Sequence, residues 1–281
     1  FSHADMVVKG GDTISGAENI AFTDKDHYEV ATCEETFVAM YRFFNNRAPA
    51  DAPENKRPTG KKTVFPLSGK ALTLGENKPL ANARVQVYEV EQRSGKRTNK
   101  KNNAVFITGN KGDWGPFYCT PGIYYEFELV PADSSRTISY YMLPFEGPDH
   151  LVYLRGLPQK GMVAGMLNQL PNKPDQALVV IFSGKKALIH GRDTMAMNNI
   201  PLSSAAYNPA SKTIISTFLF DDGDAQTSGK KIASLSMAPF IGGIDVYLPA
   251  GKNITHKVMV NGKTITLPGE PSAKKIMIAV F

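Results

Sequence analysis

Residues 83–90, ARVQVYEV, alternate apolar and polar side chains, and residues 124–130, YYEFELV, do the same. Successive side chains of a strand point to opposite faces, so Val85 and Val87 share one face of the first segment. Residues Tyr125 and Phe127 share one face of the second. Two such half-buried strands predict a small β-sandwich in this part of the chain.

Short apolar segments bounded by turn residues continue to the last residue, and glycine (24) and proline (19) are frequent enough to favour many turns over long helices. Composition is otherwise that of a globular protein, with 42% hydrophobic and 21% charged residues. We therefore expect a mostly β fold. The expected strands span residues 67–74, 83–90, 104–108, 124–130, 151–154, 177–182, 214–220, 243–248, 257–260 and 275–281, with Asn261-Gly262 as a tight hairpin.

Four regions follow from this pattern. Residues 1–47 combine short strands with an amphipathic helix, in which Val30, Cys33, Phe37, Met40, Tyr41 and Phe44 form one apolar face expected to pack on a sheet. Residues 48–62 hold three prolines and almost no large apolar side chain, which predicts a linker. Residues 63–131 form the first β domain, and residues 132–281 form a second β-sandwich or barrel.

Charge and cysteine content exclude several classes of protein. The net charge is +6, but residues 1–47 carry four basic and eight acidic groups, so the charge is lopsided. Only Cys33 and Cys119 are present, without a C-x-x-C pair, so a structural zinc site is not expected, and a disulfide between them stays open. No apolar run approaches the roughly 18 to 20 residues that a membrane-spanning helix needs.

An aspartate and a histidine in the first region could serve acyl-transfer chemistry. Asp5 and His27 each follow a predicted strand, and in serine hydrolases a carboxylate holds the imidazole that deprotonates the serine. In the α/β-hydrolase order the serine precedes the aspartate and the histidine, so this pair would fill the last two places. On spacing alone, the commoner roles are a turn cap for Asp5 and a surface-loop position for His27.

Three short segments of the first region carry a family resemblance: residues 2–8, SHADMVV; 16–20, GAENI; and 26–31, DHYEVA. They resemble the end of lipases with an α/β-hydrolase fold. Residues 79–85, PLANARV, 112–117, GDWGPF, and 121–127, PGIYYEF, look like a prealbumin-like β-sandwich module, and the remainder is similar to the C-terminal β domain of archaeal and bacterial two-domain lipases.

The resemblance implies Asp5 and His27 as catalytic residues, a lipid or other hydrophobic ester as substrate, a secreted or periplasmic location, and no cofactor or metal. The chain departs from the family because it contains no G-x-S-x-G nucleophile motif. We therefore expect it to be the C-terminal portion of a triacylglycerol-lipase-like esterase whose N-terminal hydrolase domain is missing here, and to be inactive alone.

Several other motifs have ordinary structural interpretations. A basic stretch from Arg93 to Lys101 fits a solvated hairpin tip better than a nucleic-acid site, because aromatic residues are not interleaved with the charges. Residues 221–224, DDGD, lack the glutamate that completes an EF-hand loop. Four apolar residues, Met162, Met166, Leu167 and Leu170, could form a patch for an acyl chain, but ordinary core packing is the stronger interpretation. His150, which follows Asp149, is expected to have a structural role. A second hypothesis stays open, namely a non-catalytic β-sandwich protein for binding or adhesion.

Overall fold

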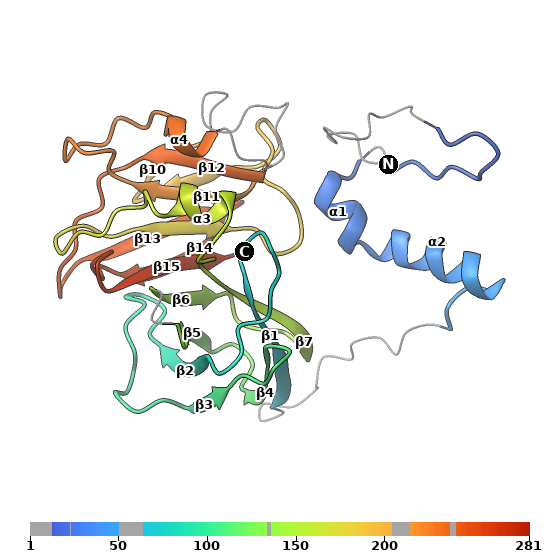
Figure 1. Cartoon of the computed structure of the whole chain (residues 1–281), viewed down its shortest axis with the longest axis horizontal. Coiled ribbons are helices and arrows are strands. Elements are labelled where there is room, and N and C mark those ends of the chain that lie inside the picture. The colour runs from blue at the N-terminus through green and yellow to red at the C-terminus, as the bar shows by residue number, and fades with distance from the viewer. Residues whose placement is uncertain (1–12, 23, 51–63, 134–135, 204–213, 237–239) are drawn as a thin grey trace.

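In the computed structural model of the chain, residues 13–22, 24–50, 64–133, 136–203, 214–236 and 240–281 are described. The fold is mostly β, as the sequence predicts (Figure 1). Its elements are α1 (His27–Thr32), α2 (Glu34–Asn45), β1 (Phe65–Thr73), β2 (Arg84–Val90), β3 (Ala104–Ile107), β4 (Asp113–Cys119), β5 (Tyr124–Val130), β6 (Thr137–Met142), β7 (Asp149–Gly156), α3 (Met162–Leu167), β8 (Val179–Phe182), β9 (Met195–Met197), β10 (Ile200–Pro201), β11 (Ile214–Phe220), α4 (Ala233–Ser236), β12 (Phe240–Asp245), β13 (Thr255–Val260), β14 (Lys263–Pro268) and β15 (Lys275–Val280).

The described strands form three sheets. The largest has eight strands in the order β12-β11-β8-β15-β6-β5-β2-β3, a second has the order β4-β1-β7, and a third has the order β10-β9-β13-β14. The two alternating segments of the sequence are neighbours in the large sheet, where Val85 lies opposite Leu129 and Val87 lies opposite Phe127. All four side chains are buried, so the predicted pattern is confirmed.

Two hydrophobic cores lie on opposite faces of the eight-stranded sheet. Along β8, Val180 belongs to the first core and Val179 and Ile181 to the second, because neighbouring side chains of a strand point to opposite faces. The three-stranded sheet contributes to the first core through residues such as Leu67, and the four-stranded sheet contributes to the second through residues such as Val258. The large sheet is therefore shared by two sandwiches.

The large sheet continues across the predicted boundary at residue 131, since β5 and β6 pair as antiparallel neighbours on its two sides. The division into residues 63–131 and 132–281 stays a prediction about folding units. Most of the linker predicted at residues 48–62 lies outside the described residues.

The sequence pattern did not predict some of the strands, and the structure shows why. Strand β4 contains Gly115-Pro116, which argues against a strand, but β4 is the edge of its sheet, where a proline can be tolerated. Strand β6 lies inside the large sheet and is buried on both faces, so its residues do not alternate. Within residues 1–47 the sequence also predicts a short strand at residues 19–22; these residues form no strand, and Phe22 makes a single β-bridge.

No helix among the described residues is long and apolar enough to cross a membrane.

Candidate functional site: the helix of His27 and its anchor

His27 is the first residue of α1, and the local sequence explains why a helix starts there. The Asp26 carboxylate accepts the backbone N–H groups of Tyr28 at 2.8 Å and Glu29 at 2.9 Å. The Glu29 carboxylate in turn accepts the N–H of Asp26 at 3.0 Å. This reciprocal capping box satisfies donors that a helix start leaves unpaired. The imidazole of His27 stacks on Phe240 of β12, with 5.6 Å between ring centroids.

The other predicted catalytic residue, Asp5, lies outside the described residues. Its place beside His27 is therefore not tested and stays a prediction.

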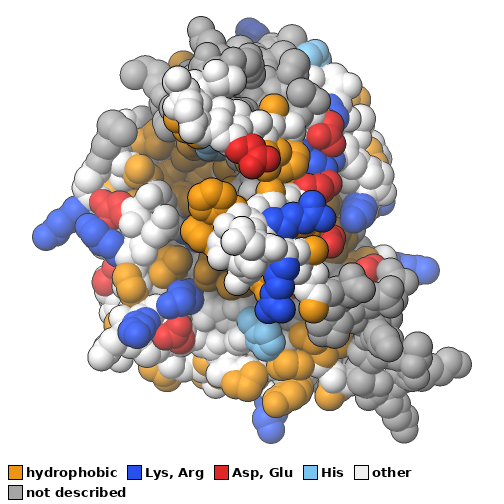
Figure 2. Space-filling model, turned by 90° about the vertical axis from the view of Figure 1, so that its right-hand side faces the viewer, with side chains coloured by type: hydrophobic (Ala, Val, Ile, Leu, Met, Phe, Trp, Pro, Cys, Tyr) orange, Lys and Arg blue, Asp and Glu red, His pale blue; other side chains and the backbone are white. Residues whose placement is uncertain are grey.

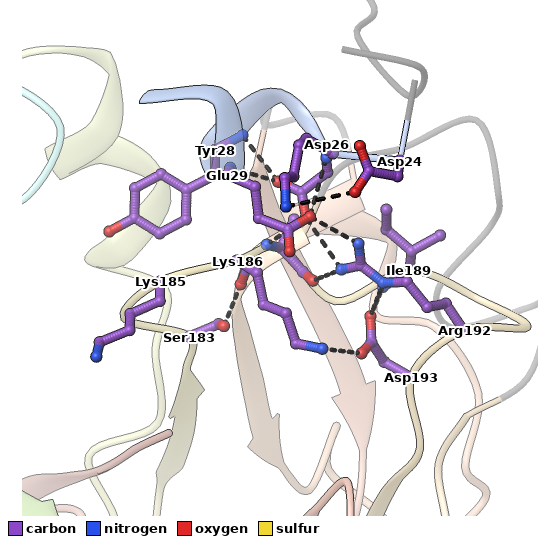
Figure 3. A network of polar contacts seen from close by, with 12 residues as sticks. Asp24, Asp26, Tyr28, Glu29, Ser183, Lys185, Lys186, Ile189, Arg192 and Asp193 are labelled. Atoms are coloured by element: carbon purple, nitrogen blue, oxygen red, sulfur yellow. Dashed lines mark hydrogen bonds and ion pairs between the residues drawn. The ribbon is translucent and has the colours of Figure 1, made fainter. Parts of the chain in front are cut away.

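An ion network ties α1 to the β domain, and we call it the Arg192 network: Asp26, Glu29, Lys186, Arg192 and Asp193 (Figure 3). The Arg192 guanidinium donates to Asp26 at 3.0 Å, to Glu29 at 2.8 Å and to Asp193 at 2.9 Å. Lys186 binds the other oxygen of Asp193 at 3.0 Å. The carboxylates that flank His27 in sequence are thus held by a cation more than 160 residues away.

Burial and charge act in opposite directions on these carboxylates. Burial raises the pKa of Asp26, but its contacts with Glu29 and Arg192 outweigh burial and leave the pKa below its ordinary value. The pKa of Asp193 is lowered in the same way, because bonds from Ile189, Asn261, Lys186 and Arg192 outweigh its burial. Both groups are therefore ionised at neutral pH, as the ion pairs require.

Backbone contacts add to the anchor, all of them with residues 184–187, which follow β8. The Tyr28 hydroxyl donates to the Gly184 carbonyl at 3.0 Å, and Thr32 donates to the Lys185 carbonyl at 2.8 Å. The N–H of Ala187 donates to Asp26 at 3.0 Å. The short helix that begins with His27 is therefore fixed to the β domain by its cap, its first turn and its last turn.

The apolar face expected on the following helix is present but does not pack on a sheet. The helix is interrupted at Cys33, which separates α1 from α2. Helix α2 has no buried residue. Phe37, Met40 and Phe44 are each more than half exposed. Figure 1 shows α2 standing away from the sheets, so the expectation that this face packs on a sheet was wrong for the described residues. Figure 2 shows hydrophobic side chains on the side of the molecule where α1 and α2 lie.

The hairpin tip expected to be solvated holds one half-buried charge, that of Arg97. Arg97 donates to Glu126 at 2.6 Å and to Glu128 at 2.6 Å, and its guanidinium lies over the Tyr88 ring. Lys275 of β15 binds the same two carboxylates from inside the sheet. The expectation was wrong for Arg97. Its guanidinium and the Lys275 ammonium neutralise the carboxylates of Glu126 and Glu128, because charges removed from water need partners of opposite sign.

The structure brings a serine to His150, which the sequence had left without a nucleophile. The Ser68 hydroxyl lies 2.9 Å from Nδ1 of His150. Asp149, however, accepts the backbone N–H of Leu151 at 2.8 Å, as an Asx turn does. The Asp149 carboxylate, which follows from sequence order as the partner of His150, therefore binds the backbone instead of the imidazole. A structural role fits Ser68 and His150 better.

The acidic run at residues 221–224 is also explained by local bonds. Asp221 pairs with Lys173 at 3.3 Å and accepts the N–H of Ala225, and Asp224 accepts the N–H of Gln226. In the part of the chain that the structure describes, no three His, Cys, Asp or Glu side chains gather so as to hold a metal ion. Both cysteines are free, Cys119 being buried and Cys33 half-buried.

A hollow in the first core is the site that the sequence could not show. It is lined by alternate residues of β6, β15, β8 and β11 and closed on one side by Leu74 and Leu157. Its volume is small, about 30 Å³, and lining side chains such as Ile138, Val180 and Ile276 are buried. We call it the apolar hollow.

Residues 63–158 match the family of the lipase C-terminal domain. This match supports a lipase C-terminal domain in that part of the chain, as the sequence resemblance implied. A second family, described only as a "-like, C-terminal domain", matches residues 169–279. The α/β-hydrolase core expected in residues 1–47 is matched by neither family and stays a prediction.

The solved structures similar to this chain include a shaft pilin. The shaft pilin SpaA from Lactobacillus rhamnosus GG is 13% identical, with a TM-score of 0.24, and the match covers 77% of this chain and 98% of the pilin. A substituted form of the same pilin is 12% identical, with a TM-score of 0.26 and coverage of 77% and 99%. At these TM-scores the likeness assigns neither a fold nor a function. No curated protein matches the chain.

Proposed function

We propose that the chain is the C-terminal portion of a secreted or periplasmic lipase or carboxylic ester hydrolase. In this proposal His27 is the general base, Asp5 orients it, and the β domain carries both the helix of His27 and contacts for a hydrophobic ester. The observation that carries the proposal is the lipase C-terminal domain match of residues 63–158, in a chain whose Arg192 network fixes the helix of His27 to the β sheets.

The proposed chemistry needs a serine from a hydrolase domain that precedes this chain. The imidazole of His27 would take the proton of that serine as its oxygen attacks the ester carbonyl, and would then give the proton to the leaving alcohol. The exposed apolar face of α2 supports the proposal, since a helix at the end of a hydrolase domain packs such a face on that domain. The acidic character of residues 1–47, against the basic remainder, suits a segment held by Arg192.

The test uses the full-length enzyme with its hydrolase domain and a short p-nitrophenyl ester. His27→Ala should lower kcat by a factor on the order of 10⁴. The matched control is His150→Ala, which removes the imidazole bound to Ser68 and should leave kcat within about twofold. Equal activity of wild type and His27→Ala would contradict the proposal, and loss of activity in the control would move the site to Ser68 and His150.

The chain alone supplies a second test. Because its sequence contains no G-x-S-x-G motif, the purified chain should not turn over the same ester. Turnover that disappears with His27→Ala would mean that a nucleophile lies within these 281 residues.

A further inference from the structure

A larger pocket lies on the face of the eight-stranded sheet that bears the second core, since Tyr141 lines it and belongs to that core. We call it the polar pocket. Its walls come from the hairpin tip at residues 95–97, from β5, β6 and β15, and from the turn between β14 and β15. Its volume is about 250 Å³. Because a water molecule occupies about 30 Å³ in the liquid, the polar pocket has room for a small organic molecule.

The floor of the polar pocket is electrically neutral. The Arg97 guanidinium donates from Nε and Nη2 to Glu126, at 2.6 and 2.9 Å, and from Nη2 to Glu128 at 2.6 Å. The Lys275 ammonium donates to Glu126, Glu128 and Ser139, which uses all three of its N–H groups. Two cations thus offset two carboxylates. The Nη1 edge of Arg97 is left over, because it makes no hydrogen bond to any residue that the structure describes.

A buried hydroxyl in the wall also lacks a partner. Tyr141 of β6 is only 2% exposed and lies opposite Glu126 of β5. Among the hydrogen bonds of the described part of the chain, none involves the Tyr141 hydroxyl. Burial and the nearby Glu126 carboxylate raise the pKa of Tyr141 well above its ordinary value, so the hydroxyl keeps its proton and is a donor. Buried polar groups are normally bonded, which makes this hydroxyl a place for a ligand to bind.

The rim of the polar pocket adds an uncompensated positive charge. Lys274 pairs with Glu270 at 2.7 Å, whereas Lys96 is exposed and forms no ion pair with the residues described. Four cations and three carboxylates line the pocket, which leaves a surplus of one positive charge. The free donors are therefore the Nη1 edge of Arg97, the Tyr141 hydroxyl and the Lys96 ammonium.

The wall that carries two of these donors is held in place before any ligand binds. Gly95 has φ of +66°, and a Cβ atom there would lie 2.3 Å from the Thr266 carbonyl oxygen of β14. The hairpin tip therefore packs backbone against backbone on β14, which only glycine permits. The Arg97 guanidinium lies 3.4 Å from the centre of the Tyr88 ring. A pocket fixed in this way loses little conformational freedom on binding.

We propose that the polar pocket binds a small phosphate monoester, with its phosphate group at Arg97, Tyr141 and Lys96. A phosphate monoester carries a charge of about −1.5 to −2 at neutral pH and has three acceptor oxygens. These match the three free donor groups and the surplus positive charge, whereas a carboxylate has only two oxygens for them. The carboxylates of the pocket are each bound to a cation, so they oppose the ligand only weakly. This inference does not depend on the proposed lipase function.

The experiment titrates the purified chain with glycerol 3-phosphate by calorimetry at an ionic strength of about 0.15 M. Glycerol 3-phosphate should bind with a millimolar or tighter Kd, and glycerol should not bind. Tyr141→Phe removes only the hydroxyl and should weaken Kd about tenfold, because it deletes a hydrogen bond to a charged group. Lys96→Ala should weaken Kd about three- to fivefold. The matched controls are Tyr118→Phe and Lys100→Ala, two exposed positions outside the pocket, and should leave Kd unchanged.

Several results would overturn the proposal. Absence of binding at millimolar glycerol 3-phosphate would do so, as would equal affinity for glycerol. Equal affinity for glycerate would replace the phosphate by a carboxylate and so contradict the assignment. Lys96→Ala changes an exposed side chain and leaves the core intact, so an unchanged Kd in this variant would overturn the proposal even if Tyr141→Phe failed to fold. Equal loss in the pocket variants and their controls would place the ligand elsewhere.

Discussion

Removing the Arg192 side chain should release α1 from the β domain. In Arg192→Ala, Asp26 keeps its three backbone N–H donors, from Tyr28, Glu29 and Ala187, but loses the cation. Asp26 is fully buried, and a hydrogen bond to a charged group contributes about 1.5–3 kcal/mol. The ion pair between Arg192 and Glu29 adds little, because the side chains of both residues are partly exposed to solvent.

The expected loss is therefore about 2–3 kcal/mol of local stability. Hydrogen exchange of the α1 amides measures it directly, and their exchange should speed up by roughly 30- to 150-fold. Arg192→Lys should restore only part of the protection, because a lysine cannot bind Asp26 and Glu29 with a planar fork. The control is Lys274→Ala, which breaks an exposed pair with Glu270 and should not change exchange in α1.

Unchanged protection of α1 in Arg192→Ala would refute the reasoning, since it would show that the backbone contacts alone hold the helix. In the full-length enzyme, the proposed function adds a second readout. Arg192→Ala should then lower kcat with little change in KM, because it loosens the helix of His27 and removes no proposed contact with the substrate.

Two further outcomes follow from buried groups. Burial raises the pKa of Glu126, but Arg97 and Lys275 outweigh burial and hold this pKa at about 2. The contribution of Glu126 to folding stability is therefore complete above its unfolded pKa of roughly 4.3 and is lost as pH falls toward 2. Urea unfolding should therefore show wild type losing about 2 kcal/mol more than Glu126→Gln between pH 7 and pH 3, and parallel losses would contradict this. Burial also raises the pKa of the Cys119 thiol to about 11. A thiol reagent at pH 8 should therefore modify Cys33 quickly and Cys119 only after the protein unfolds. Equal modification rates of the two thiols would contradict this and show that the core around Cys119 opens readily.

The strands with clear alternation could be read from the sequence. Val87 and Phe127 sit at positions whose neighbours point to the other face, so side-chain period alone predicted their burial. The same holds for the turn at Asn261-Gly262, where both residues have positive φ, and for β11, whose bounds agree with the expected segment. Local chemistry decides these features, and local chemistry is what a sequence displays.

The site could not be read in the same way. Asp26 and Arg192 are separated by 166 residues, and nothing in the local pattern of either predicts that they meet. The capping signature of residues 26–29 was visible in the sequence and could have placed the helix start at His27, but not the cation that holds it. Likewise, the residues that line the apolar hollow come from β6, β8, β11 and β15, whose order in the sheet differs from their order in the chain. Only tertiary structure decides such distances, because strand order and sheet width come from long-range pairing rather than from the residues of any one strand.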